Sequence, residues 1–133
     1  MKDDFTGMED LYRDFILDHY RNPRNAGTLE SPDVTFEDNN PLCGDKIRMD
    51  VKLCDGVIED IRFRGRGCAI SQASASLLTE AVKGKTVAEV ERIGKEEVLE
   101  NLGIQISAVR LKCALLGLKV LKQALALNVA ADL

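Results

Sequence analysis

The sequence contains no tryptophan and only one histidine, and aromatic residues make up just 5% of its 133 residues. With so few rings, the core has to be built from Leu, Ile, Val and Ala. The single histidine, His19, also limits the catalytic chemistry. A Ser-His-Asp or Cys-His system is open to this chain only if His19 is part of it.

Long hydrophobic runs and an excess of positive charge are missing as well. No stretch approaches the roughly 18 apolar residues that span a bilayer, and the opening MKDDFTGMED lacks the apolar segment of a signal peptide. The 18 basic and 22 acidic side chains give a net charge of −4, which provides no basic footprint for nucleic acid. We therefore predict a cytoplasmic protein that binds neither membrane nor nucleic acid.

Pairs of closely spaced cysteines are also absent, although the chain has four cysteines. In a reducing cytosol, thiols are more often metal ligands or catalytic groups than disulfides. The remaining composition, 45% hydrophobic and 30% charged, is globular, and the length fits a single domain over residues 1–133.

The hydrophobic periodicity predicts helices at both ends of the chain and strands between them. A helix capped by Thr6 and Glu9 should end at Asn22-Pro23, because the residue before proline is pushed out of the helical region. Alternation of apolar and charged residues predicts strands at 34–37, 46–53 and 57–63, the last two joined by an Asp55-Gly56 turn. Gly65 and Gly67 are expected to end the last strand. Helices are expected at 69–82, at 86–93 with a capping box of Thr86 and Glu89, at 95–102 and at 107–127. This order indicates an α+β fold, with a small antiparallel sheet of about three strands packed against several helices.

Three of the cysteines lie where a thiolate would be stabilised or exposed. Cys43 lies in a turn-rich loop two residues before Asp45. Cys68 directly precedes a predicted helix, whose N-terminal N–H groups favour the thiolate. Cys113 follows Lys112 in the last helix, near the positive charge of Arg110.

Three thiolates and one carboxylate match the ligand set of a tetrahedral zinc or of iron in a sulfur-rich site. The spacing alone is not diagnostic, and three unrelated cysteines remain an alternative. Cys54 has no partner in the sequence and is expected to be structural. For His19, a position on the helix surface or at the helix end is favoured over a role as ligand.

Four ordered motifs resemble the U-type iron–sulfur assembly proteins, which comprise IscU, SufU and the N-terminal domain of NifU. The resemblance runs from Leu11 to about Leu125. The motifs that carry it are Asp18-His19-Tyr20-Arg21-Asn22-Pro23-Arg24-Asn25, Asn40-Pro41-Leu42-Cys43-Gly44-Asp45, Phe63-Arg64-Gly65-Arg66-Gly67-Cys68-Ala69-Ile70-Ser71-Gln72-Ala73-Ser74-Ala75-Ser76 and Arg110-Leu111-Lys112-Cys113-Ala114.

The resemblance implies that Cys43, Cys68 and Cys113 are cluster or metal ligands and that Asp45 is the nearby carboxylate. It implies a scaffold on which a transient [2Fe–2S] cluster is built from iron, with Cys43 or Cys113 accepting persulfide sulfur. The implied partners are a pyridoxal-phosphate cysteine desulfurase and apo iron–sulfur acceptor proteins, and a homodimer is allowed. Cys54 matches no ligand of the family.

Two departures keep alternatives open. Lys112 stands where IscU-type members usually have histidine, and this Lys-Cys pair is similar to SufU-type members. The insertion typical of SufU between the second and third ligand cysteines is missing, as is the Leu-Pro-Pro-Val-Lys sequence of IscU. One alternative is a zinc-dependent sulfurtransferase that relays sulfur without building a cluster, and another is a zinc-stabilised interaction protein with no sulfur chemistry.

Smaller expectations concern two residues and the charge distribution. Lys112 is either a solvated charge or a group that lowers the pKa of Cys113 or pairs with Asp45. Tyr12, on the predicted first helix, matches a tyrosine linked to self-association in members of the family that the chain resembles, and core packing is favoured over that role here. Residues 1–18 are acidic and the last 24 residues are basic, which indicates solvated helix faces or, as the sharper hypothesis, a protein-docking surface.

Overall fold

The computed structural model describes residues 13–41 and 44–132, so the predicted Thr6–Glu9 cap and Tyr12 lie outside the described residues. The sheet consists of β1 (Val34–Asn40), β2 (Asp45–Cys54) and β3 (Val57–Arg66), antiparallel and in that order. Residues 13–21 form a helix before the sheet. Helices α2 (Ala69–Val82), α3 (Val87–Glu91), α4 (Lys95–Leu102) and α5 (Ala108–Asp132) follow it. The predicted α+β fold with a three-stranded antiparallel sheet is confirmed.

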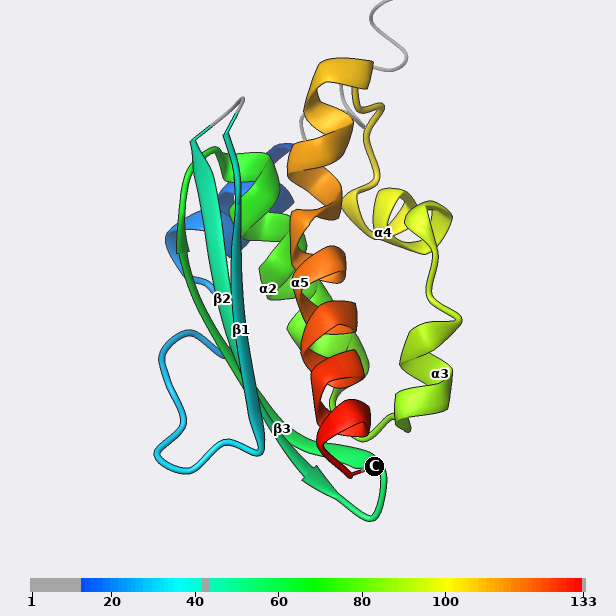
Figure 1. Cartoon of the computed structure of the whole chain (residues 1–133). Helices are drawn as coiled ribbons and strands as arrows, with labels where there is room; N and C mark the ends of the chain where they lie inside the picture. The colour runs from blue at the N-terminus through cyan, green and yellow to red at the C-terminus, as the bar shows by residue number, and fades with distance from the viewer. Residues whose placement is uncertain (1–12, 42–43, 133) are drawn as a thin grey trace, which may run out of the picture.

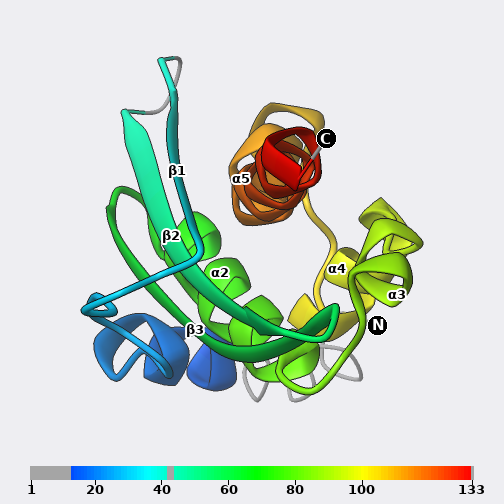
Figure 2. The same ribbon diagram turned by 60° about the horizontal axis from the view of Figure 1, so that its bottom comes forward.

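One face of the sheet is covered by α2 and α5, while α3 and α4 lie on the far side of these helices (Figures 1 and 2). The alternation predicted for β2 is present, because Ile47, Met49 and Val51 point into the core and are completely buried. Lys46 and Arg48 point to the opposite face and are partly exposed. No helix among the described residues is long and apolar enough to cross a membrane.

Close packing between α2 and α5 fixes the position of the last helix. A side chain at Gly117 would lie 3.3 Å from the Cα and Cβ atoms of Ala75, so a glycine allows the two helices to approach. The Ser74 hydroxyl also donates a 2.7 Å hydrogen bond to the backbone carbonyl of Ala114. This bond joins α2 to the residue directly after Cys113.

The strands are longer than predicted, and the extra residues lead towards one end of the sheet. β1 continues through Asn40, although Asp38, Asn39 and Asn40 are poor strand formers, because they pair with residues 45–47 of β2. β3 continues through Gly65, which was expected to end it. A side chain at Gly65 would come within 2.8 Å of the Gln72 side chain, so the glycine serves close packing.

The turn and the caps agree with the sequence more closely. Asp55 and Gly56 both have positive φ, as the predicted two-residue hairpin turn requires. Thr86 and Glu89 form the predicted capping box at the start of α3. Two helix ends differ, since α3 ends at Glu91 instead of residue 93 and α5 extends to Asp132 instead of residue 127.

Candidate metal centre

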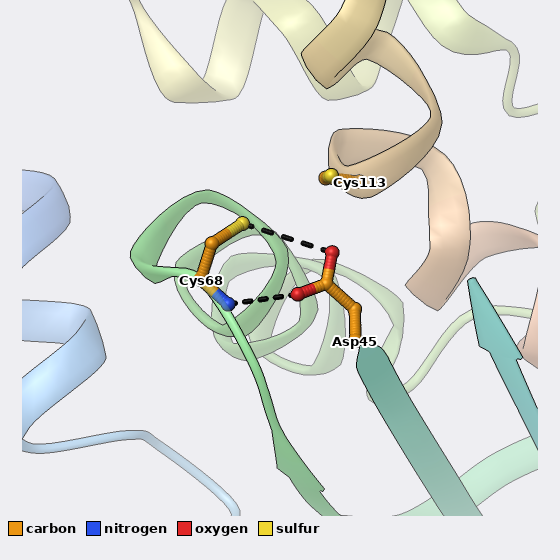
Figure 3. A group of neighbouring side chains, drawn as sticks. All are labelled: Asp45, Cys68 and Cys113. Carbon is orange, nitrogen blue, oxygen red and sulfur yellow. Dashed lines mark hydrogen bonds between the residues drawn. The ribbon is translucent and has the colours of Figure 1, made fainter. Parts of the chain in front are cut away.

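Three of the four predicted ligands meet at one end of the sheet (Figure 3). Asp45 begins β2, Cys68 directly precedes α2, and Cys113 lies in α5. One oxygen of Asp45 and the two sulfur atoms lie within 4.8 Å of one another. The three residues are separated by up to 68 positions in the chain, so only the tertiary packing of the sheet against α2 and α5 brings them together.

The fourth predicted ligand, Cys43, lies outside the described residues. Pro41 and Gly44, which flank residues 42–43 in the sequence, are described. The Gly44 N–H donates a 2.9 Å hydrogen bond to the carbonyl of Asn40, and Asn40 pairs with Asp45 in the sheet register. In the sequence Cys43 falls between these two strands, and its role as a ligand stays a prediction.

Asp45 is fully buried and is held by the start of α2. One carboxylate oxygen accepts a 2.8 Å hydrogen bond from the Cys68 N–H, and the other lies 3.7 Å from the Cys68 sulfur, to which the thiol donates. A carboxylate at a helix N-terminus is stabilised by the N–H groups that lack partners inside the helix. The start of α2 therefore fixes the position of the Asp45 carboxylate.

Gly67 is needed for that contact. Its φ is +135°, a conformation that L-amino acids rarely adopt. A Cβ atom at this position would overlap the Asp45 carboxylate and lie 2.8 Å from the Asp45 Cα atom. Glycine therefore allows the chain to pass directly over Asp45 and to place Cys68 beside it.

The two described thiols differ in their access to solvent. Cys113 is 1% exposed, whereas Cys68 is partly exposed at the first turn of its helix. The Asn40 side-chain amide lies 3.8 Å from the Cys113 sulfur and donates to it. Sequence reasoning missed Asn40 as a neighbour of the group, although it begins the Asn-Pro-Leu-Cys-Gly-Asp motif.

Cys54 does not join the group. It lies at the opposite end of β2 from Asp45 and is exposed. The negative charges of Asp55 and Glu59 raise the pKa of its thiol, so the thiolate is disfavoured there. The expectation that Cys54 is no ligand agrees with this placement.

The expected surface position of His19 is wrong. His19 does lie near the end of its helix, which was the other expected position. Its side chain, however, is only 2% exposed and packs edge-on against Phe15. Its Nδ1 shares a 2.8 Å hydrogen bond with the Ser76 hydroxyl on α2, and its Nε2 lies 3.8 Å from Glu80. Burial lowers the pKa of His19. The histidine therefore attaches the first helix to α2 and is not part of the metal-ligand group.

Lys112 is exposed, and it forms no ion pair with Asp45 or with any other described residue. The proposed pairing of Lys112 with Asp45 is thus absent. Lys112 borders a shallow pocket of about 360 Å³ together with Asn40 and Pro41. The pocket adjoins the end of the sheet where Asp45, Cys68 and Cys113 meet, which we call the thiol end, because Asn40 contacts the Cys113 sulfur.

The donor set fits a soft metal ion or an iron–sulfur cluster. A tetrahedral zinc with bonds of about 2.3 Å to sulfur places its sulfur ligands about 3.8 Å apart. The separation of up to 4.8 Å among Asp45, Cys68 and Cys113 is about one ångström wider than that. Small side-chain movements would close the gap, and Cys43 could supply the fourth ligand. Two thiols and a carboxylate at the end of an α+β fold define a sulfur-rich metal-binding class of protein.

Comparisons with known proteins place the chain within this class. The family model of the NifU-like N-terminal domain matches residues 11–129. The zinc-dependent sulfurtransferase SufU of Bacillus subtilis strain 168 is 41% identical, over 91% of this chain and 93% of its own. The iron–sulfur cluster assembly scaffold protein IscU of Escherichia coli K12 is 37% identical, over 86% of this chain and 91% of its own. This chain belongs to the NifU-like N-terminal domain family.

Solved structures agree with the fold. The FiSufU protein of the thermophile Fervidobacterium islandicum AW-1 superimposes with a TM-score of 0.73 at 28% identity, covering 84% of this chain and 93% of its own. The N-terminal NifU-like protein of Brucella abortus has a TM-score of 0.76 at 23% identity, covering 95% and 99%, which bears on the fold alone. The alignment with the Bacillus protein is 138 residues long, so that relative contains residues this 133-residue chain lacks.

Proposed function

We propose that the protein is an iron–sulfur cluster assembly scaffold that accepts persulfide sulfur from a pyridoxal-phosphate cysteine desulfurase. A [2Fe–2S] cluster would be built on Cys43, Asp45, Cys68 and Cys113 and then passed to an apo acceptor protein. The observation that carries the proposal is the convergence of Asp45, Cys68 and Cys113 within 4.8 Å. Two described thiols and an oxygen donor are a suitable set for binding iron and sulfide and for releasing them again.

Sulfur uptake needs a thiolate that a partner can reach. The acceptor thiolate attacks the outer sulfur of the donor persulfide, the donor S–S bond breaks, and the donor cysteine leaves as a thiolate. Cys43 and Cys113 are the two expected acceptors. Because Cys113 is 1% exposed, an incoming persulfide would have to displace its surroundings first. Burial therefore disfavours Cys113 as the first acceptor.

Release of the cluster is favoured because Asp45 has hydrogen-bond partners in the protein when it binds no iron. Without iron, its carboxylate accepts the Cys68 N–H at 2.8 Å and receives the thiol on its other oxygen. In the described residues, no buried side-chain nitrogen or oxygen lacks a hydrogen-bond partner. Losing the cluster thus leaves no unsatisfied carboxylate in the core, which makes oxygen ligation by Asp45 easier to reverse than thiolate ligation.

A second candidate function is a zinc-dependent sulfur relay that builds no cluster. It is supported by the 41% identity to the Bacillus protein and by Lys112 in place of histidine. In that case zinc would be held by the same four residues and would keep the thiols deprotonated until sulfur arrives. The third alternative, a zinc-stabilised interaction protein, requires the same metal site but no sulfur transfer.

One anaerobic experiment separates the three functions. The protein is incubated with a cysteine desulfurase and cysteine, with and without iron, and followed by intact mass and visible absorption. We expect a mass increase of one sulfur atom in the native protein and in Cys54→Ser, and its loss in the Cys43→Ser/Cys113→Ser double variant. Cluster absorption with iron supports the scaffold, persulfide without cluster supports the relay, and neither supports the interaction protein.

A further inference from the structure

A groove of about 630 Å³ follows the edge strand β3, and it is lined by residues of β2, β3, the first helix with the loop after it, and the start of α2. We call it the arginine groove. Its charged lining comprises the cations Lys46, Arg48, Arg64 and Arg66 and the carboxylate of Glu37, and its aromatic lining comprises Tyr20 and Phe63. Gly65, Gly67 and Gln72 also line it. The groove therefore reaches the residue directly before Cys68, and none of the described ligands Asp45, Cys68 and Cys113 lines it.

The positive charges in the groove are arranged in a way that does not favour folding. In the register of β2 and β3, Lys46 is directly opposite Arg66 and Arg48 is directly opposite Arg64. Like charges directly opposite each other on neighbouring strands are destabilising. Two such pairs stand side by side here, and a bound anionic group would relieve both.

Nearby carboxylates compensate only half of this charge. Glu37 pairs with Lys46 at 3.2 Å, and Asp50 pairs with Arg48 at 3.1 Å. Arg64 and Arg66 are exposed, and neither forms an ion pair within the part of the chain that the structure describes. Two guanidinium groups are thus left on β3 as donors for carboxylates.

The opposite wall of the groove comes from the first helix and the loop after it. This wall includes Tyr20, which is 43% exposed, and Pro23. Exposed arginine next to exposed tyrosine is the composition found at the energetic centre of protein–protein interfaces. An apolar side chain between carboxylates would complement this mixture of charges and a ring.

We propose that the arginine groove docks an acidic segment of the protein that delivers sulfur to the thiol end. That the partner is the sulfur donor rests on the proposed function. That the docking segment is acidic rests on the groove alone. A nucleic acid fits poorly, because the chain as a whole has a net charge of −4. A partner seated here contacts Arg66 and Gly67, and so lies within two residues of Cys68.

The first test does not depend on sulfur chemistry. Amide signals of the full chain are followed by NMR while a hexaglutamate peptide is added, with a hexalysine peptide as control. We expect saturable, salt-sensitive shifts at Arg64, Gly65 and Arg66 with hexaglutamate only. Shifts spread over the surface, or none in the groove, would overturn the proposal.

The second test uses charge reversal and persulfide transfer from a cysteine desulfurase. Glutamates in Arg64→Glu/Arg66→Glu would lie opposite Lys46 and Arg48 and form favourable cross-strand pairs, so the fold is not expected to be lost. The matched control is Arg92→Glu/Lys95→Glu, which makes the same charge change on exposed residues at the ends of α3 and α4.

We expect the groove variant to raise the protein concentration for half-maximal sulfur uptake by about tenfold or more, with the maximal rate largely kept. The control variant should behave like the native protein. Equal behaviour of the two variants would overturn the docking of the sulfur donor at the groove. If the native protein accepts no sulfur at all, the proposed function fails, and the peptide titration alone decides whether the groove binds acidic segments.

Discussion

Replacing Gly67 by alanine tests whether the approach of the chain to Asp45 holds the site together. Gly67 has a φ of +135°, and a Cβ atom there would overlap the Asp45 carboxylate. Gly84 provides a matched control, since its φ is +84° but a Cβ atom there would meet nothing within 4 Å. Both substitutions force alanine into a disfavoured conformation, and only Gly67→Ala also displaces Asp45.

The expected costs follow from these two differences. Alanine in a left-handed conformation costs about 1–2 kcal/mol, which is all that Gly84→Ala should lose in free energy of unfolding. Gly67→Ala adds the loss of the charge-assisted hydrogen bond from the Cys68 N–H, worth about 1.5–3 kcal/mol. We therefore expect a total of about 4 kcal/mol for Gly67→Ala.

The assay is urea unfolding and thermal unfolding of both variants, with cobalt binding followed by its visible absorption as a further readout. At roughly 4 °C per kcal/mol for a chain of this size, the thermal midpoints of the two variants should differ by roughly 10 °C. Gly67→Ala should also weaken cobalt binding, whereas Gly84→Ala should not. Equal destabilisation together with native cobalt binding by Gly67→Ala would refute the role given to this glycine.

Three further predictions concern single residues. Asp45→Ala should keep its cluster severalfold longer against an apo acceptor, because it loses its oxygen ligand; a shorter-lived cluster in a transfer assay would contradict labile ligation. Burial lowers the pKa of His19 in the folded protein, so the unfolded chain takes up this proton first, and the free energy of unfolding should fall as pH drops below about 6.5. His19→Gln should reduce that fall in urea titrations, and an unchanged pH profile would remove His19 as its cause. Lys112→Ala should leave metal retention and sulfur uptake unchanged, because Lys112 is exposed and has no ion pair with a described residue; a loss of either would restore its role beside the site.

The fold could be predicted from the sequence wherever local patterns decide it. The main hairpin could be predicted from the alternation around Ile47, Met49 and Val51 and from the Asp55-Gly56 turn. The start of α3 could be predicted from the Thr86 capping box. The ends of β1 and β3 were missed. Asn40 and Gly65 are unfavourable strand residues on their own, and pairing with β2 overrides that preference.

The site was predictable only in part. The surroundings of Cys68 at a helix start could be deduced locally, but no spacing rule brings residues 45, 68 and 113 together. Their convergence was implied by the resemblance to a family, and it depends on the packing of α2 against α5 at Gly117. His19 was misplaced for a related reason. Its partners Ser76 and Glu80 lie on a helix 57 or more residues away, which no local pattern reveals.

The central claim, that the thiol end builds a cluster, is tested most directly by visible absorption after anaerobic incubation with iron, cysteine and a desulfurase. Cys68→Ser is compared with Cys54→Ser, which makes the same substitution at the other end of β2. The account predicts cluster absorption in the native protein and in Cys54→Ser, and its loss in Cys68→Ser. Full absorption in Cys68→Ser, or none in the native protein, would contradict it.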